Sequence, residues 1–213
     1  SGAILIPAAT AASASAPRER EGGLVALFGS LAPDGAIIKR SAATPALFER
    51  TGRAIVFSSL DDLGARIDDP ELDVTADDFL VLQNAGPKSP SAMPEAGFLP
   101  IPKKLLAAGV KDMVRMSDAR MSGTAYGTII LHIAPEAAVG GPLSLVRTGD
   151  KIRLSVKERR LDLLVEEAEL AKRRSSAVRS SGSDTQGLRG YDKLFRDNVM
   201  QAPDGCDFEF LVP

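Results

Sequence analysis

Short apolar runs separated by glycine, proline and aspartate recur along the chain, and this pattern predicts many short β-strands. In the first two thirds of the sequence, the runs typical of buried strands are 23–28, 36–39, 53–57, 77–83, 110–116 and 128–133. Helices are expected between them at 45–51, 59–67 and 100–108. Ser59 is placed to cap the second of these helices, because a serine side chain accepts a hydrogen bond from the first turn.

The last third also alternates strands and helices. Strands are expected at 144–148, 151–156, 160–165 and 207–211, and helices at 166–174 and 191–200. Residues 173–187 are rich in serine, glycine and arginine and are expected to be mobile. Short strands with a few helices at their edges predict an α+β fold, with a closed or nearly closed β-barrel core of short strands flanked by helices.

Length and charge narrow the function classes. A chain of 213 residues and 22.4 kDa can bury a substantial core. We expect one barrel domain over residues 22–213, preceded by an arm or linker over residues 1–21. The net charge of −2 offers no reason to expect nucleic acid as a partner. No apolar run approaches the length of about 20 residues that a membrane span needs, so no membrane partner is expected.

Cys206 is the single cysteine of the chain. One cysteine excludes an internal disulfide framework, and it also excludes a cysteine-ligated metal cluster held by this chain alone. It indicates a reducing compartment, and we therefore expect a cytoplasmic protein. We expect Cys206 itself to be packed rather than reactive.

The polar stretch between the expected strands 110–116 and 128–133 is the strongest candidate for a ligand-binding segment. It carries Asp118, Arg120, Ser122 and Thr124, and Gly123 allows a ligand to approach the backbone closely. A polar, glycine-bearing loop between two buried strands is a common place for binding and catalytic side chains. Ordinary turn chemistry explains the same residues, so the spacing alone leaves both interpretations open.

Five blocks of sequence, in one order, resemble the dihydroxy-acid and sugar-acid (aldonate) dehydratase family. They are GLVALFGSLAPDGAIIKRS at 23–41, NAGPKSPSAMPE at 84–95, DARMSGTAYGT at 118–128, HIAPEAAVGGPLSLVRTGD at 132–150 and GCDFEFL at 205–211. The similarity extends from about Gly22 to Leu211 and is to the C-terminal domain of those enzymes. It implies a swivelling β/β/α barrel, and it implies that an N-terminal cluster-binding domain is absent from this chain.

The resemblance also implies a hydro-lyase that dehydrates a 2,3-dihydroxy acid or aldonic acid to a 2-keto-3-deoxy acid. Within the matching blocks, Ser122 corresponds to the family's catalytic base, acting as an alkoxide, and Glu95 corresponds to an Mg²⁺ ligand. Ser122 and Thr124 are the expected substrate-binding residues. The family uses an iron–sulfur cluster of the 2Fe–2S or 4Fe–4S type, whose ligands belong to the missing N-terminal domain. The chain alone is therefore expected to be inactive.

Other residues of the matching blocks are assigned to structure or left without a role. Asp118 and Arg120 are expected to pair and to hold their loop. His132, the only histidine, is expected to be a satisfied side chain in an apolar strand. Lys39 and Ser41 lie in a matching block, but the sequence gives no role to either.

Three alternatives stay open at this point. The form DARMSGTAYG at 118–127 favours a sugar-acid dehydratase over the branched-chain dihydroxy-acid enzymes, and a phosphogluconate dehydratase is a further candidate. A non-catalytic barrel that binds a small acid or mediates dimerisation is a different class of protein. The expected partners are a small polyhydroxy acid, the protein's own N-terminal domain and further copies of itself in a homo-oligomer.

Overall fold

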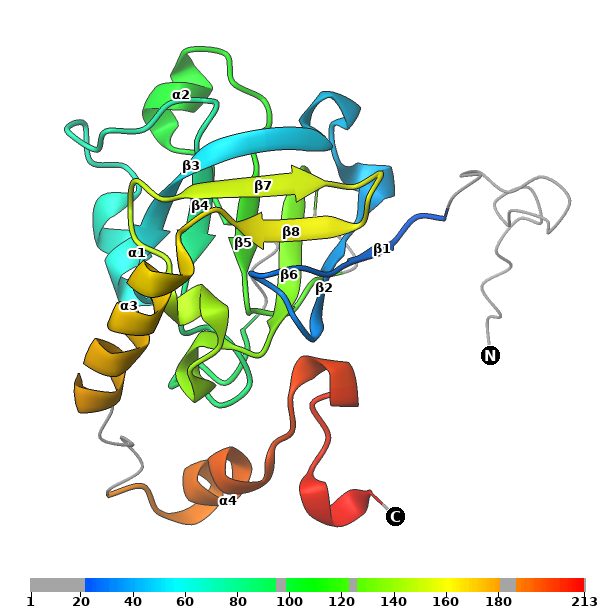
Figure 1. Ribbon diagram of the computed structural model, residues 1–213, viewed down its shortest axis with the longest axis vertical. Coiled ribbons are helices and arrows are strands. Elements are labelled where there is room, and N and C mark those ends of the chain that lie inside the picture. Colours follow the sequence, from blue (N-terminus) through cyan, green and yellow to red (C-terminus); the bar gives the residue numbers. More distant parts are fainter. Residues whose placement is uncertain (1–21, 95–98, 123–125, 181–186, 213) are drawn as a thin grey trace, which may run out of the picture.

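Eight strands form one sheet in the computed structural model, which describes residues 22–94, 99–122, 126–180 and 187–212 (Figure 1). Their order across the sheet is β1-β2-β6-β5-β4-β3-β7-β8. The strand bounds are β1 Val25–Leu27, β2 Gly35–Ile38, β3 Glu49–Phe57, β4 Phe79–Leu82, β5 Arg115–Ser117, β6 Ile129–Ala134, β7 Lys151–Ser155 and β8 Arg160–Leu163.

The four central strands run parallel to one another. β3 pairs with β4, β4 with β5 and β5 with β6 in parallel, whereas the outer pairs are antiparallel. Every residue of β4 and β5 is buried, as expected for parallel strands that are covered on both faces. Because these strands are parallel, the loops that follow β4, β5 and β6 all begin at one edge of the sheet.

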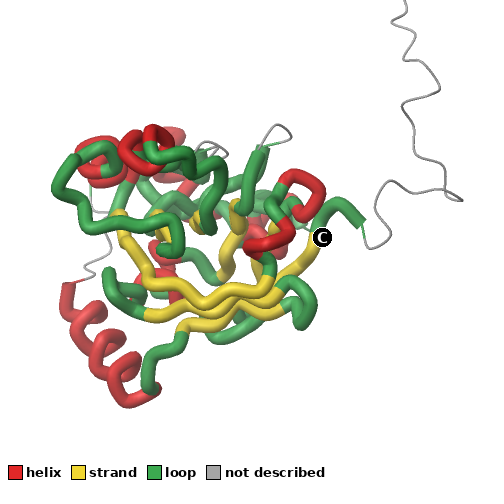
Figure 2. Tube along the Cα trace, turned by 90° about the horizontal axis from the view of Figure 1, so that it is seen from above, coloured by secondary structure: helices red, strands yellow, loops and turns green. Residues whose placement is uncertain are grey.

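The two outer strands of the sheet also meet, so the sheet is nearly closed into a barrel (Figure 2). Phe28, directly after β1, bridges to Arg160 at the start of β8. The Phe28 amide donates to the Arg159 carbonyl at 2.9 Å, and the Leu161 amide donates to the Phe28 carbonyl at 2.9 Å. Closure gives partners to backbone groups that an open edge would expose. The predicted α+β fold, with a barrel-like core flanked by helices, is confirmed.

Alternating side chains of the strands contribute to two separate apolar clusters. On β4, Phe79 and Val81 belong to the cluster inside the barrel, which takes residues from every strand, whereas Leu80 and Leu82 belong to the outer cluster. This division follows from the period of two in a strand. Leu63 of helix α1 (Leu60–Arg66) packs in the outer cluster.

Helices flank this barrel. Besides α1, the described chain contains α2 (Lys103–Ala107), α3 (Glu167–Ser180) and α4 (Gly190–Asn198). Ser59 caps α1 as predicted, and its side chain accepts a hydrogen bond from the Asp62 amide at 3.1 Å. In Figure 1, α4 and the residues after it lie below the barrel. No helix in the described ranges has the length and apolar character needed to cross a membrane.

Two strand predictions are wrong. In place of the strand expected at 144–148, the chain forms a 3₁₀ turn, Pro142–Leu145, that ends inside this range. The buried Gln83 side-chain amide donates to the carbonyls of Leu143 and Val146 at 2.6 and 3.0 Å. These two carbonyls are therefore not available for hydrogen bonds to a neighbouring strand. Residues 207–211 make one bridge, between Phe208 and Val199, and then a 3₁₀ turn, because the Phe208 backbone pairs with the segment after α4 rather than with a strand of the sheet.

One helix prediction fails because a long-range strand pairing prevails over local composition. Only a 3₁₀ turn, Pro45–Leu47, forms in the expected helix 45–51, and β3 starts at Glu49 because it pairs with β7. Helix α3 extends to Ser180 and so includes the first residues of the segment expected to be mobile, an expectation that stays a prediction. Arg173 is held there by Asp150 at 2.5 Å, a contact that composition does not reveal.

Candidate active site

Two loops beside β5 contain the candidate residues. We call residues 83–99, between β4 and α2, the acid loop, and residues 118–128, between β5 and β6, the serine loop. Each loop begins at the carboxyl end of its parallel strand. That edge is where α/β proteins with parallel sheets commonly bind ligands.

Ser122 lies half-buried in a groove of 440 Å³. The groove is lined by Gly23, Leu24, Ile37, Lys39, Ser41, Met121, Ser122 and His132. Lys39 and Ser41, to which the sequence gives no role, therefore share a groove with the candidate base. A lysine ammonium in the groove favours an anionic ligand or side chain, because opposite charge stabilises the ionised form.

Glu95 and Thr124, the other two predicted site residues, lie outside the described residues. Residues next to them are described, and these bring the two loops into contact. The Arg120 amide of the serine loop donates to the Pro94 carbonyl of the acid loop at 3.3 Å. Pro94 directly precedes Glu95, and Arg120 closely precedes Ser122 in the sequence. The two loops therefore meet next to the candidate residues.

Asp118 anchors the start of both loops from inside the protein. Its Oδ1 accepts a hydrogen bond from the Ala85 amide at 2.9 Å, and its Oδ2 accepts one from the Ala137 amide at 2.8 Å. Burial raises the pKa of Asp118, and the two amides act against that shift. The carboxyl group thus ties the acid loop, the serine loop and the turn after β6 together, which is a structural role as predicted, whereas the expected pairing with Arg120 stays a prediction.

Glu136, which follows β6, is a second buried acid, and the sequence analysis missed it. Its Oε1 accepts hydrogen bonds from the Lys88 amide at 2.9 Å and from the Gln201 side-chain amide at 2.7 Å. Burial raises the pKa of Glu136, and the bond from Gln201 opposes that rise. A Cβ on Gly86 would lie 2.2 Å from Glu136 Oε2, so the acid loop needs glycine at this point. The matching block at 132–150 contains Glu136 and was the available signal.

His132 holds the middle of the serine loop. Its Nε2 accepts a hydrogen bond from the Met121 amide at 2.9 Å, and its own amide donates to the Ala119 carbonyl at 2.9 Å. An accepting Nε2 carries no proton, so the neutral ring is protonated on Nδ1. Burial and the nearby Arg120 lower the pKa of His132, which favours this neutral form. The prediction that His132 has its hydrogen-bonding needs met is confirmed, and the side chain also lines the groove.

The described residues do not complete a metal site. They contain no group of three histidine, cysteine, aspartate or glutamate side chains placed to hold an ion. Cys206 is half-buried, with its Sγ 3.3 Å from Sδ of Met93, so its predicted packing is confirmed. Burial raises the pKa of its thiol, which disfavours the thiolate that a cluster needs. The described residues, with Cys206 as the single cysteine of the sequence, therefore do not supply the donor set of an iron–sulfur cluster.

Comparison with curated proteins points to dehydratases. The chain is 54% identical over 88% of its length to a 6-deoxy-6-sulfo-D-gluconate dehydratase of Pseudomonas putida. It is 49% identical over 92% of its length to an L-arabonate dehydratase of Azospirillum brasilense, and 38% identical over 81% to a dihydroxy-acid dehydratase of Syntrophobacter fumaroxidans. It spans only 32%, 34% and 30% of those three proteins, about a third of their length.

Comparison with models of protein families gives the same result. The family described as dihydroxy-acid/6-phosphogluconate dehydratase C-terminal matches residues 10–206, which is most of the chain. The matched range includes both loops, the groove and the two buried acids. The chain therefore belongs to the dihydroxy-acid/6-phosphogluconate dehydratase C-terminal family.

Proposed function

We propose that this chain is the C-terminal domain of a cytoplasmic dehydratase that converts an aldonic acid into a 2-keto-3-deoxy acid. The observation that carries the proposal is the bond between the Arg120 amide and the Pro94 carbonyl, which joins the segments next to Ser122 and Glu95. Relatives named as sugar-acid dehydratases are 54% and 49% identical, against 38% for one named dihydroxy-acid dehydratase. This difference favours an aldonate over a branched-chain acid.

Dehydration of such an acid needs a base for the proton on C2, and we assign that role to Ser122. Mg²⁺ held by Glu95 together with ligands from outside this chain, and an iron–sulfur cluster held entirely outside it, would supply Lewis acidity for the negative charge that develops on the substrate and on the leaving oxygen. Ser122 Oγ takes the C2 proton as an alkoxide, and Thr124 binds a substrate hydroxyl. Lys39 supports this assignment, because a cation in the same groove stabilises anionic oxygens. Loss of the C3 hydroxide leaves an enol that becomes the keto acid.

Glu95 is the Mg²⁺ ligand that we assign to this domain. Mg²⁺ prefers octahedral oxygen coordination, so one carboxylate needs further ligands from elsewhere. We assign those ligands, and the cluster cysteines, to the first two thirds that the relatives have in addition. In this scheme residues 22–213 form a swivelling domain, residues 1–21 form the connecting arm, and the isolated chain is inactive.

The C-terminal residues offer a surface for partners. Tyr191, Phe210 and Leu211 are 68%, 58% and 60% exposed. The Phe210 ring stacks on Phe208 with ring centroids 5.3 Å apart, and Phe208 in turn contacts Phe195 edge to face. Exposed apolar groups that adjoin one another commonly mark contact surfaces. We infer that the N-terminal domain and a second copy in a homo-oligomer are the partners.

The proposal is tested on the complete enzyme, in which this domain follows the first two thirds found in its relatives. The assay is anaerobic, with a reconstituted cluster and Mg²⁺. The substrate panel contains pentonates, hexonates, a hexonate with an anionic group on C6, and a branched-chain dihydroxy acid. We expect turnover of a pentonate or hexonate. We expect Ser122→Ala to lower kcat by about 10²- to 10⁴-fold, the usual contribution of a general base, with substrate binding retained.

Ser144→Ala is the matched control, because the Ser144 hydroxyl bonds the Gly141 carbonyl at 2.7 Å in a turn that does not line the groove. Its activity should equal that of the wild type. Unchanged activity of Ser122→Ala would remove Ser122 from the mechanism. Turnover of only the branched-chain acid would reassign the substrate class, and turnover of only the C6-anionic hexonate would narrow it to aldonates that carry a second anionic group. An acid that binds but is never turned over would favour the non-catalytic barrel.

A further inference from the structure

Arg115, at the start of β5, is a buried cation whose hydrogen bonds reach the far ends of both loops. The residue is only 6% exposed. Its Nη1 donates to the Leu99 carbonyl at 2.7 Å, and its Nη2 donates to the Tyr126 carbonyl at 3.3 Å. Leu99 ends the acid loop and Tyr126 lies near the end of the serine loop. One guanidinium therefore joins the two loops.

The charge of Arg115 is balanced by Asp112. Arg115 Nη2 lies 3.0 Å from Asp112 Oδ1, and both side chains are 7% exposed. Asp112 Oδ2 also accepts a hydrogen bond from the Thr128 hydroxyl at 2.7 Å, which fixes the last residue of the serine loop. Burial lowers the pKa of Arg115 and Asp112 opposes that shift, and an arginine stays charged in either case.

The backbone of the serine loop comes very close to this guanidinium. Gly127 has a φ of +100°, and a Cβ placed on it would lie 2.1 Å from Arg115 Nη2. A side chain at residue 127 would therefore displace either the loop or Arg115. The glycine allows the contact, because it adopts positive φ without steric cost.

Strand β5 thus holds both loops at both ends. At the carboxyl end of the strand, Asp118 begins the serine loop and accepts the Ala85 amide of the acid loop. At the amino end, Arg115 binds the carbonyls of Leu99 and Tyr126. Directional bonds from one strand and the residue after it therefore set the spacing of the described ends of the two loops.

We propose that Arg115 is a positioning residue of the dehydratase site, which fixes the spacing of the acid loop and the serine loop at Leu99 and Tyr126. The inference rests on the proposed function. Arg115 touches neither substrate nor metal in this scheme and acts only through the two loops. A displacement of reacting groups by about 1 Å lowers enzymatic rates by up to about 100-fold, so such a residue has a measurable effect on turnover.

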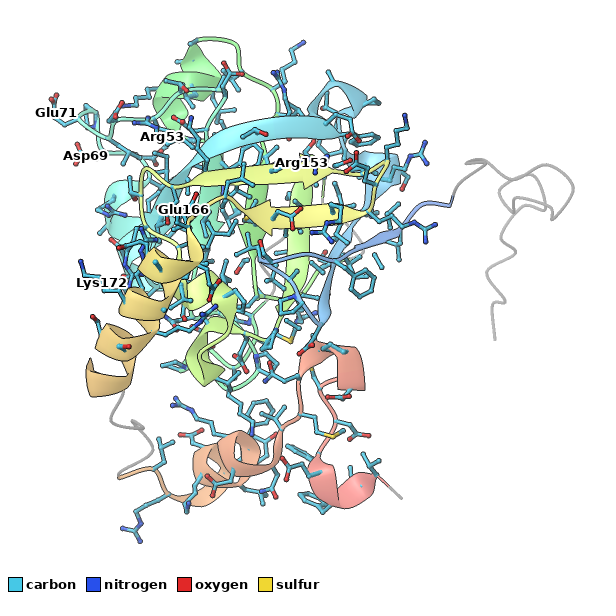
Figure 3. The ribbon with its side chains drawn as sticks, in the orientation of Figure 1. Arg53, Asp69, Glu71, Arg153, Glu166 and Lys172 are labelled. Carbon is cyan, nitrogen blue, oxygen red and sulfur yellow. The ribbon has the colours of Figure 1, made fainter. Side chains whose placement is uncertain are left out.

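Three variants separate positioning from general stability. Arg115→Met keeps an unbranched side chain but removes every donor. Arg115→Lys keeps the charge but loses the planar fork that bonds two carbonyls at once. Arg53→Met is the matched control. Arg53, a residue of β3 that is labelled in Figure 3, also forms a partly buried ion pair, 2.9 Å from Asp78. Its described bonds go to Asp73 and Asp78 rather than to either loop.

Hydrogen exchange on the 213-residue chain gives the first readout. The amides to follow are those of Arg120, which bonds Pro94, and Gly127, which bonds Ala42 at 2.9 Å. In Arg115→Met both should exchange about tenfold faster, because local opening of the loops becomes easier. The Leu161 amide at the barrel closure should keep its protection. Arg53→Met should leave the two loop amides as they are in the wild type.

Kinetics of the complete enzyme give the second readout. Arg115→Met should lower kcat by about 10- to 100-fold and weaken Mg²⁺ affinity by a similar factor, the range observed when groups supporting a site are removed. The KM for the acid should change less. Arg115→Lys should fall between Arg115→Met and the wild type, and it supplies the answer if Arg115→Met does not fold. Arg53→Met should keep wild-type kcat at any temperature at which it is folded.

The outcomes distinguish this inference from the proposed function. If Ser122→Ala is inactive while folded Arg115→Met and Arg115→Lys keep wild-type kcat, Mg²⁺ affinity and loop protection, the proposed function stands and the positioning role is overturned. If Ser122→Ala keeps full turnover, the proposed function itself fails. Equal losses of kcat in Arg115→Met and Arg53→Met would show a stability effect and would also overturn the positioning role.

Discussion

The barrel interior and the two loops beside β5 are held together by different interactions. The interior takes apolar side chains from every strand, among them Leu27 and Phe79. The loops are fixed by buried polar groups, Arg115, Asp118 and Glu136, each bonded to the loop backbone. Apolar burial is non-directional and gives stability without fixing one loop conformation. Hydrogen bonds to ionisable groups are directional, so they occur where two irregular segments must keep a fixed spacing.

Phe79→Ala should give the largest loss of stability, and it tests the barrel side of this comparison. Phe79 is 2% exposed and packs on Gly52, where a Cβ would lie 2.3 Å from its ring. We expect the free energy of unfolding to fall by about 3–5 kcal/mol, as is usual for a buried phenylalanine. Urea unfolding measures the loss. Selective loss of protection in the serine loop, with the barrel unaffected, would contradict the distinction between the two regions.

Asp118→Ala should cost somewhat less stability but more function. The change leaves the buried amides of Ala85 and Ala137 without an acceptor, at a cost of about 2–4 kcal/mol. We expect these two amides to exchange faster than in Phe79→Ala, measured at equal global stability. In the complete enzyme, kcat should fall in Asp118→Ala and stay near the wild-type value in folded Phe79→Ala. Equal kcat in the two variants would remove the functional part of the comparison.

Lys39→Met tests whether the groove, rather than the barrel, recognises the acid. We expect kcat/KM to fall by about 10- to 100-fold, equivalent to about 1.4–2.7 kcal/mol, with little change in stability. Lys157→Met is the control, because Lys157 lines a different groove, with Arg40 and Arg159. If both variants lose the same activity, the charge of Lys39 has no specific role.

Glu136→Gln should have the smallest effect at neutral pH, within about 1 kcal/mol, because its Oε1 still accepts from Lys88 and Gln201. Burial raises the pKa of Glu136 in the folded protein above its ordinary 4.5, so ionisation costs the folded state more than the unfolded state. The wild type should therefore gain stability relative to the variant as the pH falls from 7, and the gain should be complete below 4.5. Unfolding measured against pH checks this sign. A constant difference, or a relative loss of wild-type stability in acid, would contradict it.

Local patterns predicted most of the fold. The buried strands and the Ser59 cap depend on residues close in sequence, and both were found. The failures have long-range causes. Gln83 occupies carbonyls where a strand was expected, and the pairing of β3 with β7 starts a strand where the end of a helix was expected. In both cases the interacting residues are far apart in the sequence, so a short stretch of sequence does not reveal the contact.

The site was predicted only where a motif identified it. Ser122 and Glu95 came from resemblance, and the contact between their loops came from the structure. Glu136 lies in a matching block, but neither it nor Arg115 has a sequence neighbour that shows which distant backbone groups the side chain will bond. The position of Lys39 in the same groove as Ser122 is known only from the structure, in which the end of β2 lies beside the serine loop.

The central claim is that Glu95 and Ser122 face one pocket, and a crystal structure of the complete enzyme with Mn²⁺ in place of Mg²⁺ tests it most directly. Anomalous scattering locates the metal without reference to the protein. We predict a Glu95 carboxylate oxygen at about 2.1–2.2 Å from the ion, close to the usual Mg²⁺ distance, and Ser122 Oγ facing the same pocket. A metal bound without Glu95, or a Ser122 side chain on the opposite face of the domain, would contradict the account.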